Sequence, residues 1–101
     1  MSEIDVLEKM LIDAGIEYDR EDIDNDYAGY VYSFHQIRSK KSNGGKWKWD
    51  AICHKGSWGY EQGLLEVWGD YMNEPEGNLT AEEAFEKIKW ILGQGVKNDT
   101  D

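Results

Sequence analysis

The chain has 101 residues and a formal net charge of −10 at pH 7, from 21 acidic and 11 basic side chains. This length fits one domain with one core, for which five Trp, six Tyr and two Phe supply large apolar groups. The acidic balance disfavours attraction to phosphate backbones and anionic membranes, and no stretch has the roughly 20 continuous apolar residues that a membrane span requires.

A first helix is predicted for residues 2–14. Ser2 is a favoured N-cap residue, and Gly15 can adopt the left-handed conformation that ends a helix. The apolar residues at helical spacing on one face are Ile4, Leu7, Met10, Leu11 and Ala14. The next segment, 16–26, alternates imperfectly and is rich in acids, which predicts an exposed edge strand that runs into a loop.

The middle of the chain predicts a β-hairpin. Residues 28–37 are rich in β-branched and aromatic side chains and form the first strand. The turn lies at 40–45, where Asn-Gly-Gly can reach positive φ. Residues 46–54 form the return strand, and alternation places four of its side chains on one face: Trp47, Trp49, Ala51 and Cys53.

The last third predicts a strand, a turn and a helix. Residues 64–68 are compatible with a strand or a helical turn, and their length and flanking glycines favour the strand. A turn is expected at 74–78. Thr80 and Glu83 form a capping box that begins the last helix, and Gly93 is expected to end it.

The predicted fold is α+β. An antiparallel sheet of three or four strands has an N-terminal and a C-terminal helix packed on one face. Residues 1–96 form a single domain, and 97–101 form a frayed C-terminal tail.

Two segments carry a resemblance to a known group of proteins. One is 54–69, His-Lys-Gly-Ser-Trp-Gly-Tyr-Glu-Gln-Gly-Leu-Leu-Glu-Val-Trp-Gly, and the other is 77–85, Gly-Asn-Leu-Thr-Ala-Glu-Glu-Ala-Phe. They resemble small uncharacterised phage and prophage proteins of Gram-positive bacteria. The resemblance covers roughly the C-terminal half and implies a phage origin, which favours an accessory protein that binds a host factor.

The location is predicted from what the chain lacks. Cys53 is the only cysteine, so no internal disulfide can form. The first thirty residues contain no secretory signal pattern. Together with the phage resemblance, this predicts a protein of the bacterial host cytoplasm, with no membrane partner.

The acidic segment is the first candidate binding site. Dense carboxylates attract the Lys and Arg side chains of a partner. The predicted partner-binding residues are Glu17, Asp19, Glu21, Asp22, Asp24 and Asp26. The spacing at 22–26 resembles the start of a calcium loop, but Tyr27 stands where that loop needs Gly and Ser33 where it needs a bidentate Glu. We therefore expect no metal and no other cofactor.

The glycine-rich segment 56–63 is the second candidate site. Its glycines match neither a P-loop, nor a dinucleotide fingerprint, nor a nucleophile elbow. We interpret it as a recognition loop in which two aromatic rings pack inward and three polar side chains group outside. Its residues are His54, Ser57, Trp58, Tyr60 and Glu61.

Catalysis is not indicated by any motif. Cys53 and His54 are adjacent in a strand and so point to opposite faces, which prevents a thiol–imidazole pair. The two Lys and two Trp at 46–49 resemble a nucleic-acid-binding pattern, but a Trp face directed into the core explains them equally, and the overall negative charge favours that interpretation.

The predicted function is therefore non-enzymatic. The leading hypothesis is a phage or prophage accessory protein that binds a basic host protein through its acidic surface, as a nucleic-acid mimic or an anti-defence inhibitor. The alternative is binding of nucleic acid or a nucleotide-like ligand through the Lys/Trp hairpin and Gly-rich loop at 40–60.

Overall fold

The computed structural model describes residues 2–27, 30–40, 47–54, 57 and 59–99, and for 25–27, 30–32 and 95–99 it describes the backbone alone. The predicted turn at 40–45 and Trp58 therefore lie wholly or largely outside the described residues. No helix in this described part is long and apolar enough to cross a membrane.

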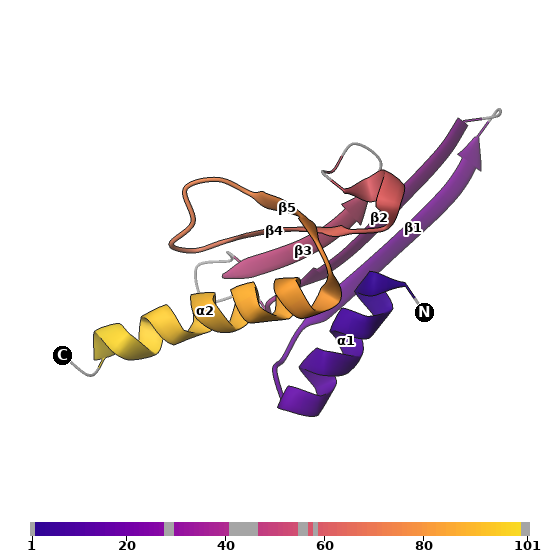
Figure 1. Ribbon diagram of the computed structural model, residues 1–101. Coiled ribbons are helices and arrows are strands. Elements are labelled where there is room, and N and C mark those ends of the chain that lie inside the picture. Colours follow the sequence, from indigo (N-terminus) through magenta and orange to yellow (C-terminus); the bar gives the residue numbers. More distant parts are fainter. Residues whose placement is uncertain (1, 28–29, 41–46, 55–56, 58, 100–101) are drawn as a thin grey trace.

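The fold is an antiparallel sheet with a helix before it and a helix after it (Figure 1). This confirms the α+β class and the single domain. The described part contains five strands in the order β1-β2-β3-β4-β5, so the prediction of three or four was wrong. The elements are α1 (Glu3–Ala14), β1 (Asp19–Tyr27), β2 (Tyr30–Arg38), β3 (Trp49–His54), a short 3₁₀ helix η1 (Tyr60–Gln62), β4 (Leu65–Gly69), β5 (Glu76–Leu79) and α2 (Ala81–Asp99).

The first helix has the caps that its sequence predicts. The Ser2 side chain accepts a hydrogen bond from the Asp5 amide, and Gly15 adopts a left-handed conformation with φ 71°. The amide of Gly15 donates to Ile12 and the amide of Ile16 to Leu11, which satisfies carbonyls at the helix end.

The first two strands form a long hairpin. Their pairing runs from Asp19↔Arg38 to Tyr27↔Tyr30, so the end of segment 16–26 is strand rather than the predicted loop. β1 lies at an edge of the sheet, as predicted. β3 pairs with β2 only as far as Phe34↔His54, so residues 24–27 and 30–33 extend past the third strand as two paired strands (Figure 1).

The fifth strand occupies part of the segment predicted as a turn. Leu65 pairs with Leu79 and Val67 with Glu76, and a register irregularity lies between these pairs. Pro75, Gly77 and Asn78 are turn-forming residues, and Asn78 does have a positive φ of 59°. The burial of Leu79 against the core nevertheless holds this short edge segment against β4.

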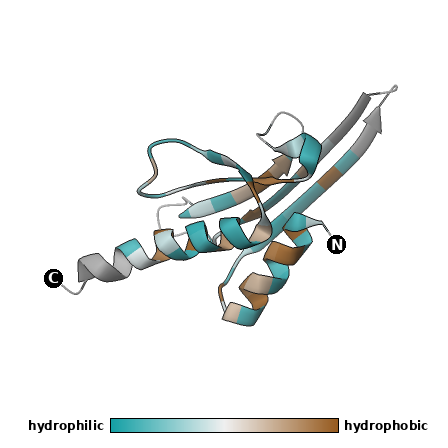
Figure 2. Cartoon of the chain, viewed as in Figure 1, coloured by the Kyte–Doolittle hydropathy of each residue, from teal (hydrophilic) through white to brown (hydrophobic). Residues whose placement is uncertain are grey.

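One hydrophobic core joins the sheet to both helices. Ile37, Ala51 and Val67 are neighbours across β2, β3 and β4 and are fully buried. The helices contribute apolar side chains, and α1 has brown, hydrophobic stretches in Figure 2: Ile4, Leu7 and Leu11 from α1, and Ala81, Ala84, Ile88 and Ile91 from α2. The helices contact each other, and both contact β3.

Two local predictions fail near these elements. Trp49 is buried as predicted, but Trp47 is 40% exposed, because β3 begins only at Trp49 and strand alternation does not extend to Trp47. The last helix does not end at Gly93 but continues to Asp99. A helical glycine costs only about 1 kcal/mol relative to alanine, which is too little to end a helix by itself. The predicted tail at 97–101 is therefore helical as far as Asp99.

Candidate binding surfaces

The predicted acidic segment does not form one surface. β1 side chains alternate between the two faces of the sheet. Arg20 contacts Asp5 and Glu8 of α1, so the even-numbered residues, including Asp22 and Asp24, lie on the side of α1. The odd-numbered acids Asp19 and Glu21 lie on the opposite face, and Glu17 is exposed before the strand. The side chain of Asp26 lies outside the described residues.

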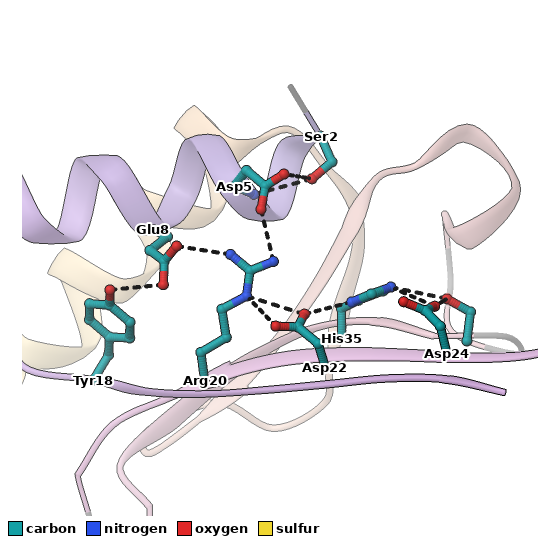
Figure 3. A network of polar contacts seen from close by, with 9 residues as sticks. Ser2, Asp5, Glu8, Tyr18, Arg20, Asp22, Asp24 and His35 are labelled. Atoms are coloured by element: carbon teal, nitrogen blue, oxygen red, sulfur yellow. Dashed lines mark hydrogen bonds and ion pairs between the residues drawn. The ribbon is translucent and has the colours of Figure 1, made fainter.

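Arg20 is the centre of a group of carboxylates (Figure 3). Its Nη2 lies 2.8 Å from Asp5 Oδ1, its Nη1 3.0 Å from Glu8 Oε1 and its Nε 2.9 Å from Asp22 Oδ2. The Arg20 side chain is 18% exposed, so three acids from two elements are held around a largely enclosed cation.

His35 extends this group along β2. Its Nδ1 lies 2.6 Å from Asp22 Oδ1, and its Nε2 lies 3.2 Å from Asp24 Oδ1. A carboxylate only accepts hydrogen bonds, so this geometry requires a hydrogen on Nδ1. The Ser33 hydroxyl donates to Asp24 over 2.9 Å. We refer to Asp5, Glu8, Arg20, Asp22, Asp24 and His35 as the Arg20 cluster.

The Arg20 cluster keeps an excess of negative charge. It contains four carboxylates and one guanidinium, together with an imidazole. Hydrogen bonds from Ser2 and Arg20 lower the pKa of Asp5. Burial opposes the charge on Arg20, but hydrogen bonds to Asp5 and Asp22 outweigh it and raise the pKa of the guanidinium. Burial and a hydrogen bond to Glu8 raise the pKa of Tyr18.

The acids on the opposite face of β1 also have intramolecular partners. Asp19 pairs with Lys40 at 2.6 Å and Glu21 with Arg38 at 3.1 Å. Each of these pairs matches one acid with one base, so they add little net charge to that face. Among the β1 acids whose side chains the structure describes, the unbalanced negative charge therefore lies in the Arg20 cluster.

A polar network crosses the same opposite face. Arg38 donates to Gln36 Oε1 over 2.8 Å, and Gln36 Nε2 donates to Asp50 Oδ2 over 2.8 Å. Gln36 is buried, and burial raises the pKa of Asp50 even though the hydrogen bond from Gln36 acts in the other direction. The guanidinium of Arg38 lies 4.9 Å from the centre of the Trp47 ring. Trp68, also on this face, is 44% exposed.

The predicted recognition loop has a structural serine at its start. Ser57 is 9% exposed, so the expectation that its side chain lies outside was wrong. Its hydroxyl donates to the His54 carbonyl over 2.7 Å and accepts from the His54 amide over 3.1 Å. These two hydrogen bonds direct the hydroxyl toward the end of β3. The His54 ring stacks on Phe34, Tyr60 is half-buried, and Glu61 is exposed.

Nucleophilic and metal chemistry have little support in the described part of the chain. Burial raises the pKa of the Cys53 thiol, which disfavours the reactive thiolate. His35 pairs with Cys53 across the strands, but its two ring nitrogens face Asp22 and Asp24. Within the described residues no group of three or more His, Cys, Asp or Glu side chains is arranged to hold a metal ion.

Sequence reasoning identified the acids of the Arg20 cluster on β1 but missed the residues that organise them. The period-two spacing of Arg20, Asp22 and Asp24 in a predicted strand indicates that they share a face. No sequence signal connects them with Asp5 and Glu8, because that contact depends on how α1 lies against the sheet. Comparison with known proteins finds no match for this chain among family models, curated proteins or solved structures.

Proposed function

We propose that the protein is a non-enzymatic phage or prophage accessory protein of the host cytoplasm, and that it binds a basic surface of a host protein through the Arg20 cluster. The observation that carries this proposal is the excess of carboxylates held around one enclosed guanidinium. The resemblance of 54–69 to phage proteins supports the origin by association alone.

The geometry of the Arg20 cluster suits recognition of a cationic partner. Its carboxylates are held in place by ion pairs of 2.8–3.0 Å from two different elements, so little conformational entropy is lost when a partner binds. We place both helices on one face of the sheet, because the buried side chains of the two helices belong to the same core as the buried side chains of neighbouring strands. α1 and β1 then present their acids together to one partner.

Such a surface also resembles the charge pattern of nucleic acid. Lys and Arg side chains that line a nucleic-acid groove respond to the field of closely spaced negative charges. A protein with net charge −10 and a cluster of fixed carboxylates can occupy such a groove. Mimicry of nucleic acid is thus the form of inhibition that the charges favour.

The test is affinity capture from host lysate followed by association kinetics with the purified partner. We expect Asp22→Asn with Asp24→Asn to slow association at low salt, and the difference from the unaltered protein to shrink as salt screens exposed charges. The matched control is Asp70→Asn with Glu82→Gln, which removes two exposed acids elsewhere. Equal association rates for both variants at every salt concentration would contradict the proposal.

The alternative is binding of nucleic acid or a nucleotide-like ligand through the hairpin and loop at 40–60. The exposure of Trp47 and its contact with Arg38 favour a stacking site. Burial of Trp49 removes the second indole from such a site. Fluorescence anisotropy with a labelled single-stranded oligonucleotide separates the two functions, since the acidic-surface proposal expects no binding at physiological salt.

A further inference from the structure

A pocket of about 460 Å³ lies between the β4–β5 loop and α2. It is at the end of the sheet order opposite β1, away from the strand that carries the Arg20 cluster. Residues from both elements line it, among them Tyr71, Met72, Glu74, Glu76, Lys87 and Trp90. None of them has a part in the proposed function.

One half of this pocket already holds a cation. The ammonium group of Lys87 lies 2.9 Å from Glu76 Oε2 and 5.3 Å from the centre of the Trp90 ring. Lys87 and Trp90 are three residues apart on α2 and so share a helix face. The chemistry of this half is therefore a positive charge held between a carboxylate and the face of an aromatic ring.

Two further residues of the pocket lining, Tyr71 and Glu74, supply the same two kinds of group. Tyr71 is 57% exposed and Glu74 is exposed. Among the residues that the structure describes, Tyr71 has no ring or cation contact and Glu74 has no ion pair. Tyr71 also has a positive φ of 68°, which is uncommon for a bulky residue, and it belongs to the pocket lining.

The charges of the pocket leave room for one further cation. Glu74 and Glu76 carry two negative charges, and Lys87 compensates one of them. A guanidinium matches the remaining groups best, because its planar fork pairs with a carboxylate while its face stacks on an aromatic ring.

We propose that the pocket between the β4–β5 loop and α2 binds an arginine side chain of a basic polypeptide, with Glu74 and Tyr71 as its direct contacts. Lys87 keeps its ion pair with Glu76 and its contact with the Trp90 ring, and so holds these two side chains of the pocket in place. This site goes beyond the proposed function and does not depend on the Arg20 cluster.

The proposal is tested by NMR titration of the full chain with the capped peptide Gly-Gly-Arg-Gly-Gly. We expect binding at roughly millimolar affinity, with shift changes in the amides of residues 71–76 and 87–90 and in the Trp90 indole. The control peptide has citrulline in place of arginine, which keeps the shape and removes the charge. Equal shifts with the citrulline peptide would overturn the proposal.

Two variants test the contacts. Glu74→Gln and Tyr71→Asn should each lower the affinity for the arginine peptide by about two- to fivefold, as expected for one exposed charge or cation–π contact. Asparagine tolerates positive φ, so Tyr71→Asn removes the ring while keeping the turn, and a dispersed spectrum verifies the fold. Glu82→Gln removes the same charge at an exposed position outside the pocket lining.

The outcomes separate this site from the acidic surface of α1 and β1. Unchanged affinity of Glu82→Gln for the arginine peptide supports binding in the pocket. An equal loss of affinity in Glu74→Gln and Glu82→Gln would show a general charge effect and overturn the proposal. Shift changes confined to Arg20, Asp22 and Asp24 would also overturn the pocket while leaving the proposed function intact.

Discussion

Ser57 satisfies both polar backbone groups of His54 at the end of β3 through its hydroxyl. The Ser57 amide also donates to the His54 carbonyl over 2.8 Å, so this carbonyl keeps one partner without the hydroxyl. The hydroxyl is also an acceptor for the His54 amide, over 3.1 Å. The serine hydroxyl therefore stabilises the first turn of the loop that follows β3.

We expect Ser57→Ala to lower the free energy of unfolding by about 1–2 kcal/mol, because the two hydrogen bonds between the buried hydroxyl and the His54 backbone are lost. Denaturant titration measures this change. Glu61→Gln is the control in the same loop, and as a change at an exposed side chain it should stay within about 0.5 kcal/mol. An unchanged midpoint for Ser57→Ala would show that the hydroxyl is not needed for the turn.

Asp50 makes the folded protein less stable as its carboxyl loses a proton. Burial raises the pKa of Asp50 above its ordinary value of 3.8, so the folded state binds this proton more tightly than the unfolded chain. The contribution of Asp50 to stability is therefore fully present below pH 3.8 and is lost as pH rises through the higher, folded-state pKa.

Asp50→Asn should remove this part of the pH dependence. Asparagine keeps an oxygen that can accept from Gln36 but carries no charge. We expect the variant to lose less stability than the unaltered protein between pH 3 and pH 7, measured by denaturant titration at each pH. Parallel stability curves for the two proteins would contradict this expectation.

At the scale of elements, α2 packs on β4 through a position that has no room for a side chain. A Cβ atom on Gly69 would lie 2.6 Å from Ile91 Cδ1 and 2.8 Å from the Lys48 carbonyl oxygen. The flexible Ile91 methyl can move, but the Lys48 carbonyl is backbone and also accepts from the Asp70 amide. Gly69 thus sets the distance between the helix and the sheet.

Gly69→Ala should lower the free energy of unfolding by about 1–3 kcal/mol, the usual cost of overpacking a core. Gly93→Ala is the matched control on α2, since a Cβ atom there meets nothing within 4 Å. Alanine favours a helix, so this control should gain about 0.5–1 kcal/mol. Thermal unfolding of both variants compares them, and equal midpoints would refute the close approach.

At the scale of the whole molecule, a largely enclosed cation joins the first helix to the first hairpin. The molecule is elongated, 55 × 27 × 27 Å, and Arg20 of the long β1–β2 hairpin binds α1 through the carboxylates of Asp5 and Glu8. Two-stranded ribbons are marginally stable alone. The guanidinium therefore joins elements that would otherwise repel each other.

Arg20→Gln should lower the free energy of unfolding by about 1–3 kcal/mol at low salt, because Asp5, Glu8 and Asp22 are left without their shared cation. Added salt should reduce this loss, since it screens the repulsion among the partly exposed acids. Unfolding at low and high salt measures the difference. A loss that does not change with salt would indicate that Arg20 acts by packing rather than by charge.

The candidate site was predictable in part. The density of acids at 17–26 indicated an acidic binding segment, and β1 does carry Asp22 and Asp24 into the Arg20 cluster. The division of the acids between the two faces of the sheet could be inferred only when the whole segment was known to be a strand. The contacts to Asp5 and Glu8 join residues far apart in the chain and have no local pattern.

The sequence by itself determined the elements whose signals act over a few residues. The Ser2 cap, the left-handed Gly15 and the capping box of Thr80 and Glu83 each concern groups within four residues, so neighbouring residues suffice to specify them. The two helix starts, the first helix end, the edge position of β1 and the α+β class followed from such signals and from hydrophobic periodicity.

Only the tertiary structure decided the features that depend on contacts across the chain. β5 forms because Leu79 is buried beside Leu65, although its own residues favour a turn. Trp49 is buried while Trp47 is exposed because the register of β3 with its neighbours begins between them. α2 continues past Gly93 because burial of Ile88 and Ile91 anchors the helix, and the energy of such packing exceeds local propensity.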